Sequence, residues 1–436
     1  MPVGGPWGAA GYPSQMAVAT RTIAESCIAA KRAARTLAGA PTAVKDAALA
    51  ATARLLDERV ATILEANAAD LADERAAGLT DALRDRLTLT PERVAAMAEG
   101  VRVVGALDDP VGEELDHRTL SSGIDLRKIR VPLGVVGVIY EARPNVTIDC
   151  AALTIKSGNA IVLRGSSYAQ RSNAALASIV REALAEAGLP EDSVLLVDAG
   201  DRDGLAELAT QEGVVDLLIP RGGEGLKEAI KAVATVPVMY AAAGNCHVYV
   251  HADADLEMAK AIVVNAKVQR PGVCNAAEKL LLDVAIAERF GPEIFAALAA
   301  EGVELLGDER ARAVAGDAAV GAAGEDDWDT EYLALKMAVA VVDSVEDAIE
   351  HVNAHGTGHS EAIVTDDGQA AEAFVAGVDA AAVYVNASTR FTDGFEYGMG
   401  AEIGNSTQKL HARGPIGMRE LTTTKYVGRG SGQVRG

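Results

Sequence analysis

The 436-residue chain is long enough for about two or three domains, and its 49% hydrophobic composition supplies apolar side chains for full cores. Lys and Arg number 40 against 62 Asp and Glu, so the formal net charge is -22, and a nucleic-acid phosphate backbone would be repelled. No run approaches about 18 uninterrupted apolar residues, which excludes a membrane span. We therefore expect a globular protein acting on a small molecule, and an anionic substrate must be held by a few local donors.

The opening residues and the cysteines indicate the cellular setting. Residues 1–16 are rich in Gly and Pro and lack the basic and apolar regions of a signal peptide, so we expect a disordered N-terminal tail. The four cysteines lie far apart, with no C-x-x-C pair and no Cys/His spacing typical of zinc sites. We expect neither a structural metal nor a disulfide framework, and a reducing cytoplasm fits best.

The predicted elements change in character along the chain. From residue 14 to about 105 the sequence is alanine-rich, with apolar residues at helical spacing. Five strand-like apolar runs then alternate with helical segments, and a second series of five follows the Gly244-Asn245 turn. This alternation predicts an α/β fold with two doubly wound parallel sheets, hence two lobes with a cleft between them. The ten runs are 134–140, 160–165, 193–198, 214–220 and 236–241, then 246–251, 279–284, 337–343, 361–366 and 381–386.

Two charged, alternating segments belong to neither series. Residues 112–131 are typical of a hairpin and 417–427 of an edge strand, and both are suited to pairing with another subunit, so we expect a homo-oligomer. The resulting division is a tail over 1–16, a first domain over 17–111 and 134–244, a second domain over 245–413, and an oligomerisation arm over 112–133 and 414–436.

Three polar stretches follow strands at the edge where open α/β folds bind ligands. Asn145, after "EARP", could donate to a developing oxyanion or could only cap the next helix. Gly222 and Gly223 precede a helix whose N-terminus could meet a phosphate, although they could serve only a tight turn.

The third stretch is "AIVLRGSS", in which Arg164 ends a strand and Ser166 and Ser167 follow. An arginine followed by two hydroxyls is suited to binding an extra phosphate on a ribose. A ribose with free hydroxyls is instead usually held by a carboxylate, and none stands here. The alternative is a solvated strand end.

Cys274 lies in the turn "RPGVCN" between a helical run and an apolar strand. A turn cysteine can be a nucleophile, but free cysteine is also among the most buried residue types, and both interpretations stand on local grounds. Cys27, Cys150 and Cys246 lack a Gly-flanked turn and are predicted to pack in the core. His247, on a strand, is predicted to be packed as well.

The longest motifs resemble a known family. Residues 130–165, "GNCHVYV", "VQRPGVCNAAEKLL" and "FEYGMGAEIGNSTQKLHARGP" are similar to the gamma-glutamyl phosphate reductase (glutamate-5-semialdehyde dehydrogenase) family of proline biosynthesis, within the aldehyde dehydrogenase superfamily. The resemblance extends from about residue 24 to 430. It implies an aldehyde dehydrogenase-like fold and NADPH-dependent reduction of L-glutamyl 5-phosphate to L-glutamate 5-semialdehyde and phosphate.

The resemblance also assigns residues. It implies that Cys274 is the catalytic cysteine and that Asn145, with the Cys274 N–H, forms the oxyanion hole. Arg164 takes the place of the lysine that reaches the adenosine ribose, and Ser167 that of a glutamate in NAD-preferring members, which supports NADP+/NADPH. The remaining assignments are Gly222 and Gly223 near the pyrophosphate, Glu331 on the nicotinamide ribose, and Arg143, Arg270 and Arg390 as substrate-binding candidates or structural ion-pair partners.

One departure from the superfamily bears on the reaction. Hydrolytic members have a general-base glutamate where this sequence has Ala241. Without it, water is not activated against a cysteine thioester, which agrees with reduction of an activated acid. Two alternatives remain, an acylating dehydrogenase using a coenzyme A thioester and a non-catalytic scaffold on the same fold. A glutamate 5-kinase is a further possible partner, since it would supply the acyl phosphate.

Overall fold

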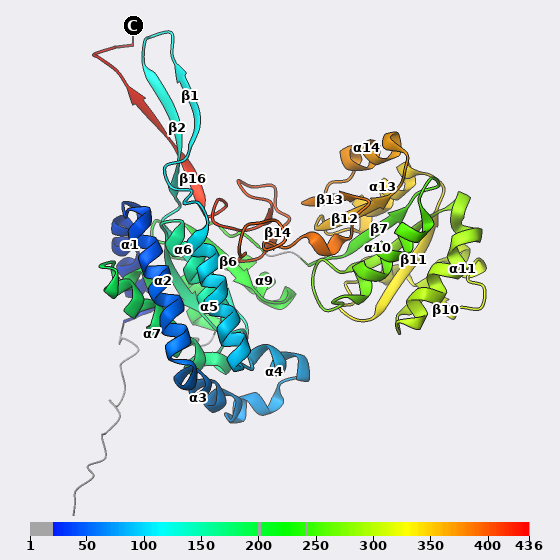
Figure 1. Cartoon of the computed structure of the whole chain (residues 1–436), viewed down its shortest axis with the longest axis horizontal. Helices are drawn as coiled ribbons and strands as arrows, with labels where there is room; N and C mark the ends of the chain where they lie inside the picture. Colours follow the sequence, from blue (N-terminus) through cyan, green and yellow to red (C-terminus); the bar gives the residue numbers. More distant parts are fainter. Residues whose placement is uncertain (1–20, 199–201, 241–242, 436) are drawn as a thin grey trace, which may run out of the picture.

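The computed structural model describes residues 21–198, 202–240 and 243–435. The predicted tail over 1–16 and Ala241 lie outside these residues. Two lobes and a projecting β arm make up the described chain (Figure 1). No helix among the described residues is long and apolar enough to cross a membrane.

A helical layer opens the first lobe, as the alanine-rich periodicity predicts. Its first helix begins with a capping box in which Thr22 and Glu25 satisfy each other's backbone N–H groups, and its last begins with Thr90 as cap and Pro91 at the first turn. The helices are α1 (Ile23–Ala38), α2 (Thr42–Glu58), α3 (Val60–Leu71), α4 (Asp81–Leu87) and α5 (Pro91–Ala106), with the 3₁₀ turn η1 (Glu74–Gly78).

A parallel sheet of four strands, in the order β5-β4-β3-β6, forms the centre of the first lobe. The strands are β3 (Val135–Tyr140), β4 (Ala160–Arg164), β5 (Val194–Leu196) and β6 (Leu217–Arg221). The connecting helices are α6 (Asn145–Lys156), α7 (Gln170–Glu186), α8 (Arg202–Ala209) and α9 (Glu224–Lys231), with 3₁₀ turns η2 (Ser167–Ala169) and η3 (Glu191–Ser193).

The prediction of a fifth strand over 236–241 is wrong for the part that the structure describes. Val238 makes only an isolated bridge to Leu218 of β6. Pro237 accepts a hydrogen bond from the Leu218 N–H but has no N–H of its own to return, so the ladder does not extend.

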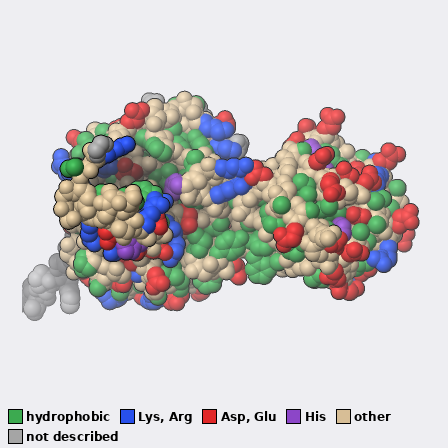
Figure 2. Space-filling model, turned by 90° about the horizontal axis from the view of Figure 1, so that it is seen from above, with side chains coloured by type: hydrophobic (Ala, Val, Ile, Leu, Met, Phe, Trp, Pro, Cys, Tyr) green, Lys and Arg blue, Asp and Glu red, His purple; other side chains and the backbone are tan. Residues whose placement is uncertain are grey.

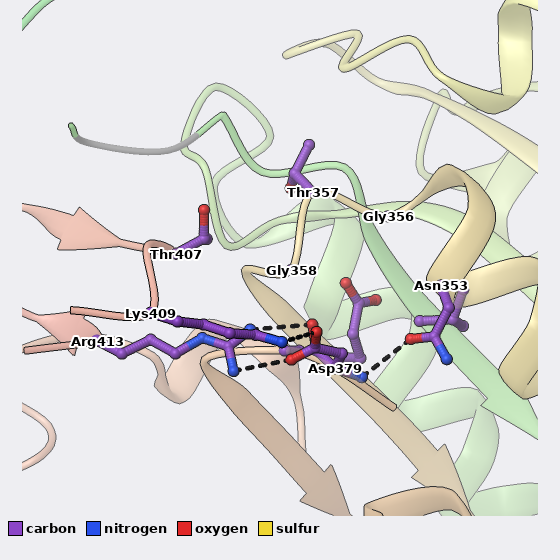
Figure 3. A pocket seen from close by; sticks show the side chains of 11 residues that line it. Asn353, Gly356, Thr357, Gly358, Asp379, Thr407, Lys409 and Arg413 are labelled. Atoms are coloured by element: carbon purple, nitrogen blue, oxygen red, sulfur yellow. Dashed lines mark hydrogen bonds and ion pairs between the residues drawn. The ribbon is translucent and has the colours of Figure 1, made fainter. Parts of the chain in front are cut away.

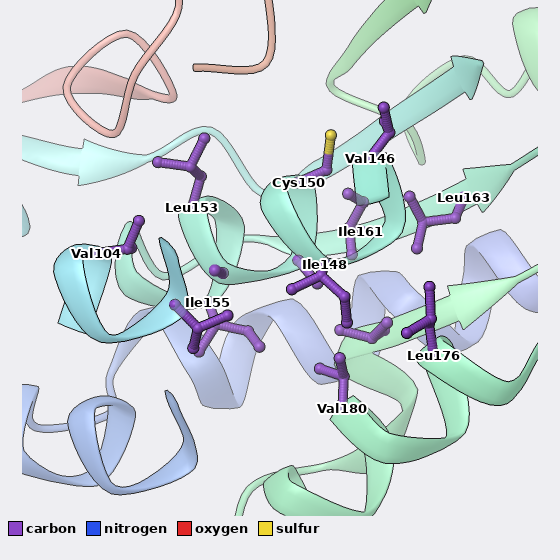
Figure 4. Packing of buried hydrophobic residues seen from close by; sticks show 14 of the residues in the cluster. Val104, Val146, Ile148, Cys150, Leu153, Ile155, Ile161, Leu163, Leu176 and Val180 are labelled. Carbon is purple, nitrogen blue, oxygen red and sulfur yellow. The ribbon is translucent and has the colours of Figure 1, made fainter. Parts of the chain in front are cut away.

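Buried apolar side chains join the sheet of the first lobe to its helices. Val146, Ile148 and Leu153 of α6 pack against Leu163 of β4 and Leu176 of α7 (Figure 4). The burial of every residue of β3 and β4 follows from helices covering both faces of the sheet. This packing fixes the start of α6, where Asn145 lies.

The second lobe contains a parallel sheet in the order β10-β9-β11-β8-β7-β12-β13. All five runs predicted there are strands, and two short strands were not predicted because they are only four and three residues long. The strands are β7 (Cys246–Val250), β8 (Ala277–Asp283), β9 (Glu304–Gly307), β10 (Val320–Ala322), β11 (Lys336–Val342), β12 (Ser360–Val364) and β13 (Ala382–Val385). The helices are α10 (Leu256–Val268), α11 (Val284–Ala300), α12 (Glu309–Ala313), α13 (Val345–His355) and α14 (Gly368–Gly377), with η4 (Glu325–Trp328) and η5 (Thr389–Phe391).

The arm is an antiparallel three-stranded sheet in the order β1-β2-β16. Its strands β1 (Glu114–Thr119) and β2 (Asp125–Pro132) form the predicted hairpin, and β16 (Thr422–Arg429) pairs with the other edge of β2. Between the second lobe and β16, the chain returns across the first lobe through β14 (Asn405–Ser406) and β15 (Gly414–Pro415). The C-terminal segment therefore contacts both lobes and the arm.

Candidate active site

Cys274 lies in the turn between α10 and β8, as the sequence indicates. The turn is tied to a neighbouring loop by Asn275, whose side-chain N–H donates to the Thr392 carbonyl at 2.9 Å. In return, the Thr389 hydroxyl donates to the Asn275 carbonyl at 2.7 Å. These bonds hold the cysteine in a defined position against η5.

A close backbone approach supports the other side of the Cys274 turn. A Cβ added to Gly244 would lie 1.3 Å from the Cys274 carbonyl oxygen, so only glycine fits there. The Cys246 thiol donates to the same carbonyl at 3.2 Å, and the Glu331 carboxylate accepts from the Gly244 N–H at 2.7 Å. The segment that joins the lobes is therefore anchored directly to the cysteine and to Glu331.

The Cys274 thiol is protonated at neutral pH in this state of the protein. Burial raises its pKa to about 11, the Arg221 guanidinium opposes the rise, and the Glu402 and Glu331 carboxylates add to it. Formation of the reactive thiolate therefore needs further positive charge or realignment when ligands bind.

The other three cysteines differ from Cys274 in exposure. Cys27, Cys150 and Cys246 are buried, in agreement with the prediction that they pack in the core, whereas Cys274 is partly exposed. Burial raises the pKa of Cys27 to about 12 and that of Cys246 well above its usual value. Cys274 is thus the cysteine that a solute can reach.

Asn145 is the first residue of α6, with an exposed side chain. The alternative that it only caps the helix is wrong, because Pro144 occupies the cap position and no side-chain cap bond is present. Its amide N–H instead donates to Asp149 at 2.9 Å. Burial raises the pKa of Asp149 to about 6, against the opposing effects of Asn145 and Arg221. The oxyanion role of Asn145 stays a prediction.

The three arginines predicted near the substrate come from separate segments and influence one another. Burial and the positive charges of Arg86, Arg221 and Arg270 together lower the pKa of Arg143 to about 10. Burial also lowers the pKa of Arg390, followed by the charge of Arg270.

Arg390 is additionally fixed by a 2.8 Å hydrogen bond from its Nε to the Gln269 side chain. The fold therefore gathers arginines of both lobes around Cys274. Arg86 and Arg221 were not predicted from the sequence as site residues. The position of Arg221 at the end of β6, directly before Gly222, was the available signal.

The residues predicted to bind the cofactor lie on the first lobe, apart from Glu331. Arg164 ends β4 and is 9% exposed. Its guanidinium lies beside Gly204, since a Cβ added to that glycine would be 3.8 Å from the Arg164 Nε. Ser166 caps η2 by accepting from the Tyr168 N–H, and Ser167 is partly exposed. A guanidinium and two hydroxyls are a donor set that fits a ribose phosphate.

Gly222 and Gly223 form the exposed turn between β6 and α9. The Gly223 N–H donates to the Glu141 carboxylate at 2.9 Å, and a Cβ on Gly222 would lie 2.7 Å from the same oxygen. The turn therefore fits a negative charge, since the chain places one there itself. A pyrophosphate at this helix end would have to displace Glu141.

A polar hollow of about 450 Å³ lies between the second lobe and the C-terminal segment (Figure 3). Asp379 accepts from Arg413 at 2.9 Å and also pairs with Lys409, while its backbone N–H donates to Asn353. Asp379 pairs with both cations and offsets one of their two positive charges, so the hollow attracts an anion less strongly than two unpaired cations would. It serves to join the C-terminal segment to the second lobe.

Two chemical features complete the description of the site. Among residues 21–198, 202–240 and 243–435, no group of three or more His, Cys, Asp or Glu side chains is arranged to hold a metal ion. His247 is fully buried, as predicted, with its backbone N–H donating to Glu361 at 2.6 Å. The reactive groups of the site are a cysteine, amides and arginines.

Comparison with known proteins agrees with this arrangement. Residues 12–314 and 328–427 match the Aldehyde dehydrogenase family. The chain is 54% identical over 406 residues to the gamma-glutamyl phosphate reductase of Moorella thermoacetica, covering 93% of this chain and 97% of the relative. It is 53% identical over 406 residues to that of Thermobifida fusca, with 93% and 97% covered.

A crystal structure of the gamma-glutamyl phosphate reductase of Thermotoga maritima superimposes with a TM-score of 0.92 at 48% identity, covering 94% of this chain and 99% of that one. An acetylating aldehyde dehydrogenase of Geobacillus thermoglucosidasius has the same fold, with a TM-score of 0.67 at 20% identity. The chain belongs to the aldehyde dehydrogenase family and groups within it with the gamma-glutamyl phosphate reductases.

Proposed function

We propose that this chain catalyses NADPH-dependent reduction of L-glutamyl 5-phosphate to L-glutamate 5-semialdehyde and phosphate, the second step of proline biosynthesis from glutamate. The observation that carries the proposal is the 54% identity with a gamma-glutamyl phosphate reductase over 93% of the chain. The partly exposed Cys274 within a group of arginines supplies the matching chemistry, a nucleophile beside groups that hold an anion.

Cys274 performs the first step as a thiolate. Its sulfur attacks the carbonyl carbon of the acyl phosphate, and negative charge develops on the carbonyl oxygen. The Asn145 amide and the Cys274 N–H donate to that oxygen in this mechanism, and the carbon–oxygen bond to phosphate then breaks to leave a thioester. NADPH, when bound, would supply the hydride that reduces the thioester. The resulting hemithioacetal releases the aldehyde and the cysteine, and the aldehyde is expected to cyclise to pyrroline-5-carboxylate.

The cofactor assignment rests on the residues that line the end of β4. Enzymes of this family use NAD or NADP, and the preference for NADPH is part of the proposal. Arg164, Ser166 and Ser167 would hold the ribose phosphate, Gly222 and Gly223 the pyrophosphate, and Glu331 the nicotinamide ribose. The Glu331 carboxylate accepts a hydrogen bond from the Gly244 N–H, which fixes the position of its side chain. A carboxylate held in this way can orient the ribose.

The proposal extends to the setting of the enzyme. The arm supports a homo-oligomer, since its sheet projects from the first lobe with exposed strands. Four free cysteines, with no disulfide among them, support a cytoplasmic location. Direct transfer of the labile acyl phosphate from a glutamate 5-kinase would protect it from hydrolysis.

The reverse reaction tests the function, because glutamyl phosphate is too labile to supply easily. Purified protein is mixed with L-glutamate 5-semialdehyde, NADP+ and phosphate, and NADPH absorbance is followed, with Cys274→Ala as control. Phosphate-dependent NADPH formation that disappears in the control is expected. NADPH formation that ignores phosphate, or requires coenzyme A instead, would overturn the proposal.

A further inference from the structure

Three arginines of the first lobe are partly buried but have no ion-pair or hydrogen-bond partner for their guanidinium groups among the residues that the structure describes. They are Arg86, Arg143 and Arg221. Other partly buried arginines, such as Arg130 and Arg181, pair with carboxylates. A partly desolvated cation without a partner is costly, and acids are abundant in a chain with a net charge of -22. These three positions therefore indicate an anion that the protein itself does not supply.

Arg221 is the member of this group closest to the predicted chemistry. It is the last residue of β6 and pairs in register with Tyr140, the last residue of β3, so it lies at the carboxyl edge of the parallel sheet. Its side chain lies on Gly404, where an added Cβ would be 2.6 Å from a guanidinium nitrogen. Figure 1 shows β6 and the β14 segment together on the side of the first lobe that faces the second.

The electrostatic reach of Arg221 extends to both halves of the site. Its charge lowers the pKa of Cys274 on the second lobe and that of Asp149 on the first. Asp149 is the residue that holds the Asn145 amide. Arg221 thus acts on both the nucleophile and the residue that holds the predicted oxyanion donor, and its guanidinium has no hydrogen-bond partner among the described residues.

We propose that Arg221 is a catalytic residue that binds the phosphoryl group of the acyl-phosphate substrate, with Arg143 adding positive charge beside it. This inference rests on the proposed function and deepens it. When the Cys274 sulfur forms its bond to the carbonyl carbon, the carbon–oxygen bond to phosphate breaks and its electron pair stays on the departing oxygen. The phosphate gains one negative charge, which the guanidinium offsets by bidentate hydrogen bonds, and water then supplies the proton. In reverse, Arg221 holds inorganic phosphate for attack on the thioester.

The first test is the kinetics of the reverse reaction for Arg221→Gln and Arg221→Lys. We expect the apparent KM for phosphate to rise at least tenfold in Arg221→Gln and less in Arg221→Lys, with the KM for aldehyde and for NADP+ within twofold of the unmodified protein. Arg181→Gln is the matched control, a partly buried arginine of the same lobe whose partners are Glu191 and Asp192. An unchanged KM for phosphate in Arg221→Gln would overturn the inference.

A second test does not need turnover. The rate of Cys274 alkylation by iodoacetate, an anion, is divided by the rate with neutral iodoacetamide, and inorganic phosphate is titrated in as the probe. Phosphate should slow the alkylation of Cys274 by iodoacetate in the unmodified protein and in Arg181→Gln. In Arg221→Gln and Arg221→Lys, the ratio of the iodoacetate rate to the iodoacetamide rate should fall, and phosphate should protect Cys274 less. Equal ratios in all four proteins would reject an anion site at Arg221.

The two tests separate the inference from the proposed function. If the unmodified protein shows no phosphate-dependent turnover but phosphate still protects Cys274 through Arg221, the proposed function fails and the anion site stands. If turnover depends on phosphate in every variant with the same KM, the function stands and Arg221 is excluded as the phosphoryl ligand.

Discussion

At the scale of single residues, the protonated Cys274 has a direct consequence for reactivity. The pKa of its thiol is about 11 because burial and two nearby carboxylates outweigh the charge of Arg221. We expect the rate of iodoacetamide labelling of Cys274 to rise with pH and to be still rising above pH 9, since only the thiolate reacts. Mass spectrometry of the labelled peptide measures this rate at each pH. A plateau near pH 7 would show a thiolate already present in the free enzyme.

Asn145 offers a clean separation of catalysis from stability. It is exposed, does not cap α6 and bonds only Asp149 among the described residues, so Asn145→Ala should lower the thermal unfolding midpoint only modestly, through the loss of this one hydrogen bond. Loss of an oxyanion donor should lower kcat about 100- to 1,000-fold. Calorimetry and steady-state kinetics on the same sample check both parts. A normal kcat would remove Asn145 from the oxyanion hole.

His359 makes the stability of the second lobe depend on pH. The side chain is fully buried beside the Ser360 hydroxyl, and burial lowers its pKa from 6.5 to about 4. The folded-state pKa is depressed, so the stabilisation is present above pH 6.5 and is lost as the pH falls towards 4, because the unfolded chain binds the proton first. A gap of about 2.5 between the two pKa values corresponds to about 3 kcal/mol.

The unfolding midpoint of the unmodified protein should therefore fall between pH 6.5 and 4, and less steeply in His359→Gln. The exposed His411 supplies the control, since His411→Gln should retain the full pH dependence. Identical slopes for His359→Gln and the unmodified protein would contradict the assignment.

At the scale of elements, a buried ion pair ties α10 to β8 on either side of the Cys274 turn. The Lys267 ammonium lies 2.8 Å from the Glu278 carboxylate, and both side chains are 0% exposed. Burial lowers the pKa of Lys267 and raises that of Glu278, which shows how much desolvation opposes both charges. The pair is stable because each charge satisfies the other.

Lys267→Met should destabilise the second lobe by about 3 to 5 kcal/mol, because it leaves the buried Glu278 carboxylate without its ion-pair partner. The double variant Lys267→Met with Glu278→Gln should recover most of this loss, as measured by chemical unfolding. Lys260→Met removes the exposed pair with Glu293 and should cost less than about 1 kcal/mol. A double variant as unstable as Lys267→Met alone would show that packing, rather than the unpaired charge, causes the loss.

The elements also show where periodicity stops being informative. The run over 236–241 has the apolar composition of a strand, but Pro237 limits its described part to one bridge. Strand β9 pairs with the edge of β11, and β10 pairs in turn with β9. Both strands contain too few residues to show a period.

At the scale of the whole molecule, the arm carries its own prediction. It exposes Leu115 on β1 and Tyr426 on β16, which are 41% and 56% exposed. We expect the protein to elute with a mass well above the 44.9 kDa of one chain, and Leu115→Glu combined with Tyr426→Glu to shift it to the monomer, because a partner must otherwise bury the new charges. Light scattering coupled to size exclusion measures the mass. A monomer before substitution would exclude the oligomer.

The sequence by itself determined the alternation of strands and helices, the turn position of Cys274 and the family resemblance, because local periodicity and contiguous motifs encode these features. Only the tertiary structure decided that Arg143, Arg221, Arg270 and Arg390, far apart along the chain, share one electrostatic environment around the cysteine. The same holds for the pKa of Cys274, which depends on burial and on carboxylates brought in by distant segments. Charge and desolvation act through space, so no local pattern of residues specifies them.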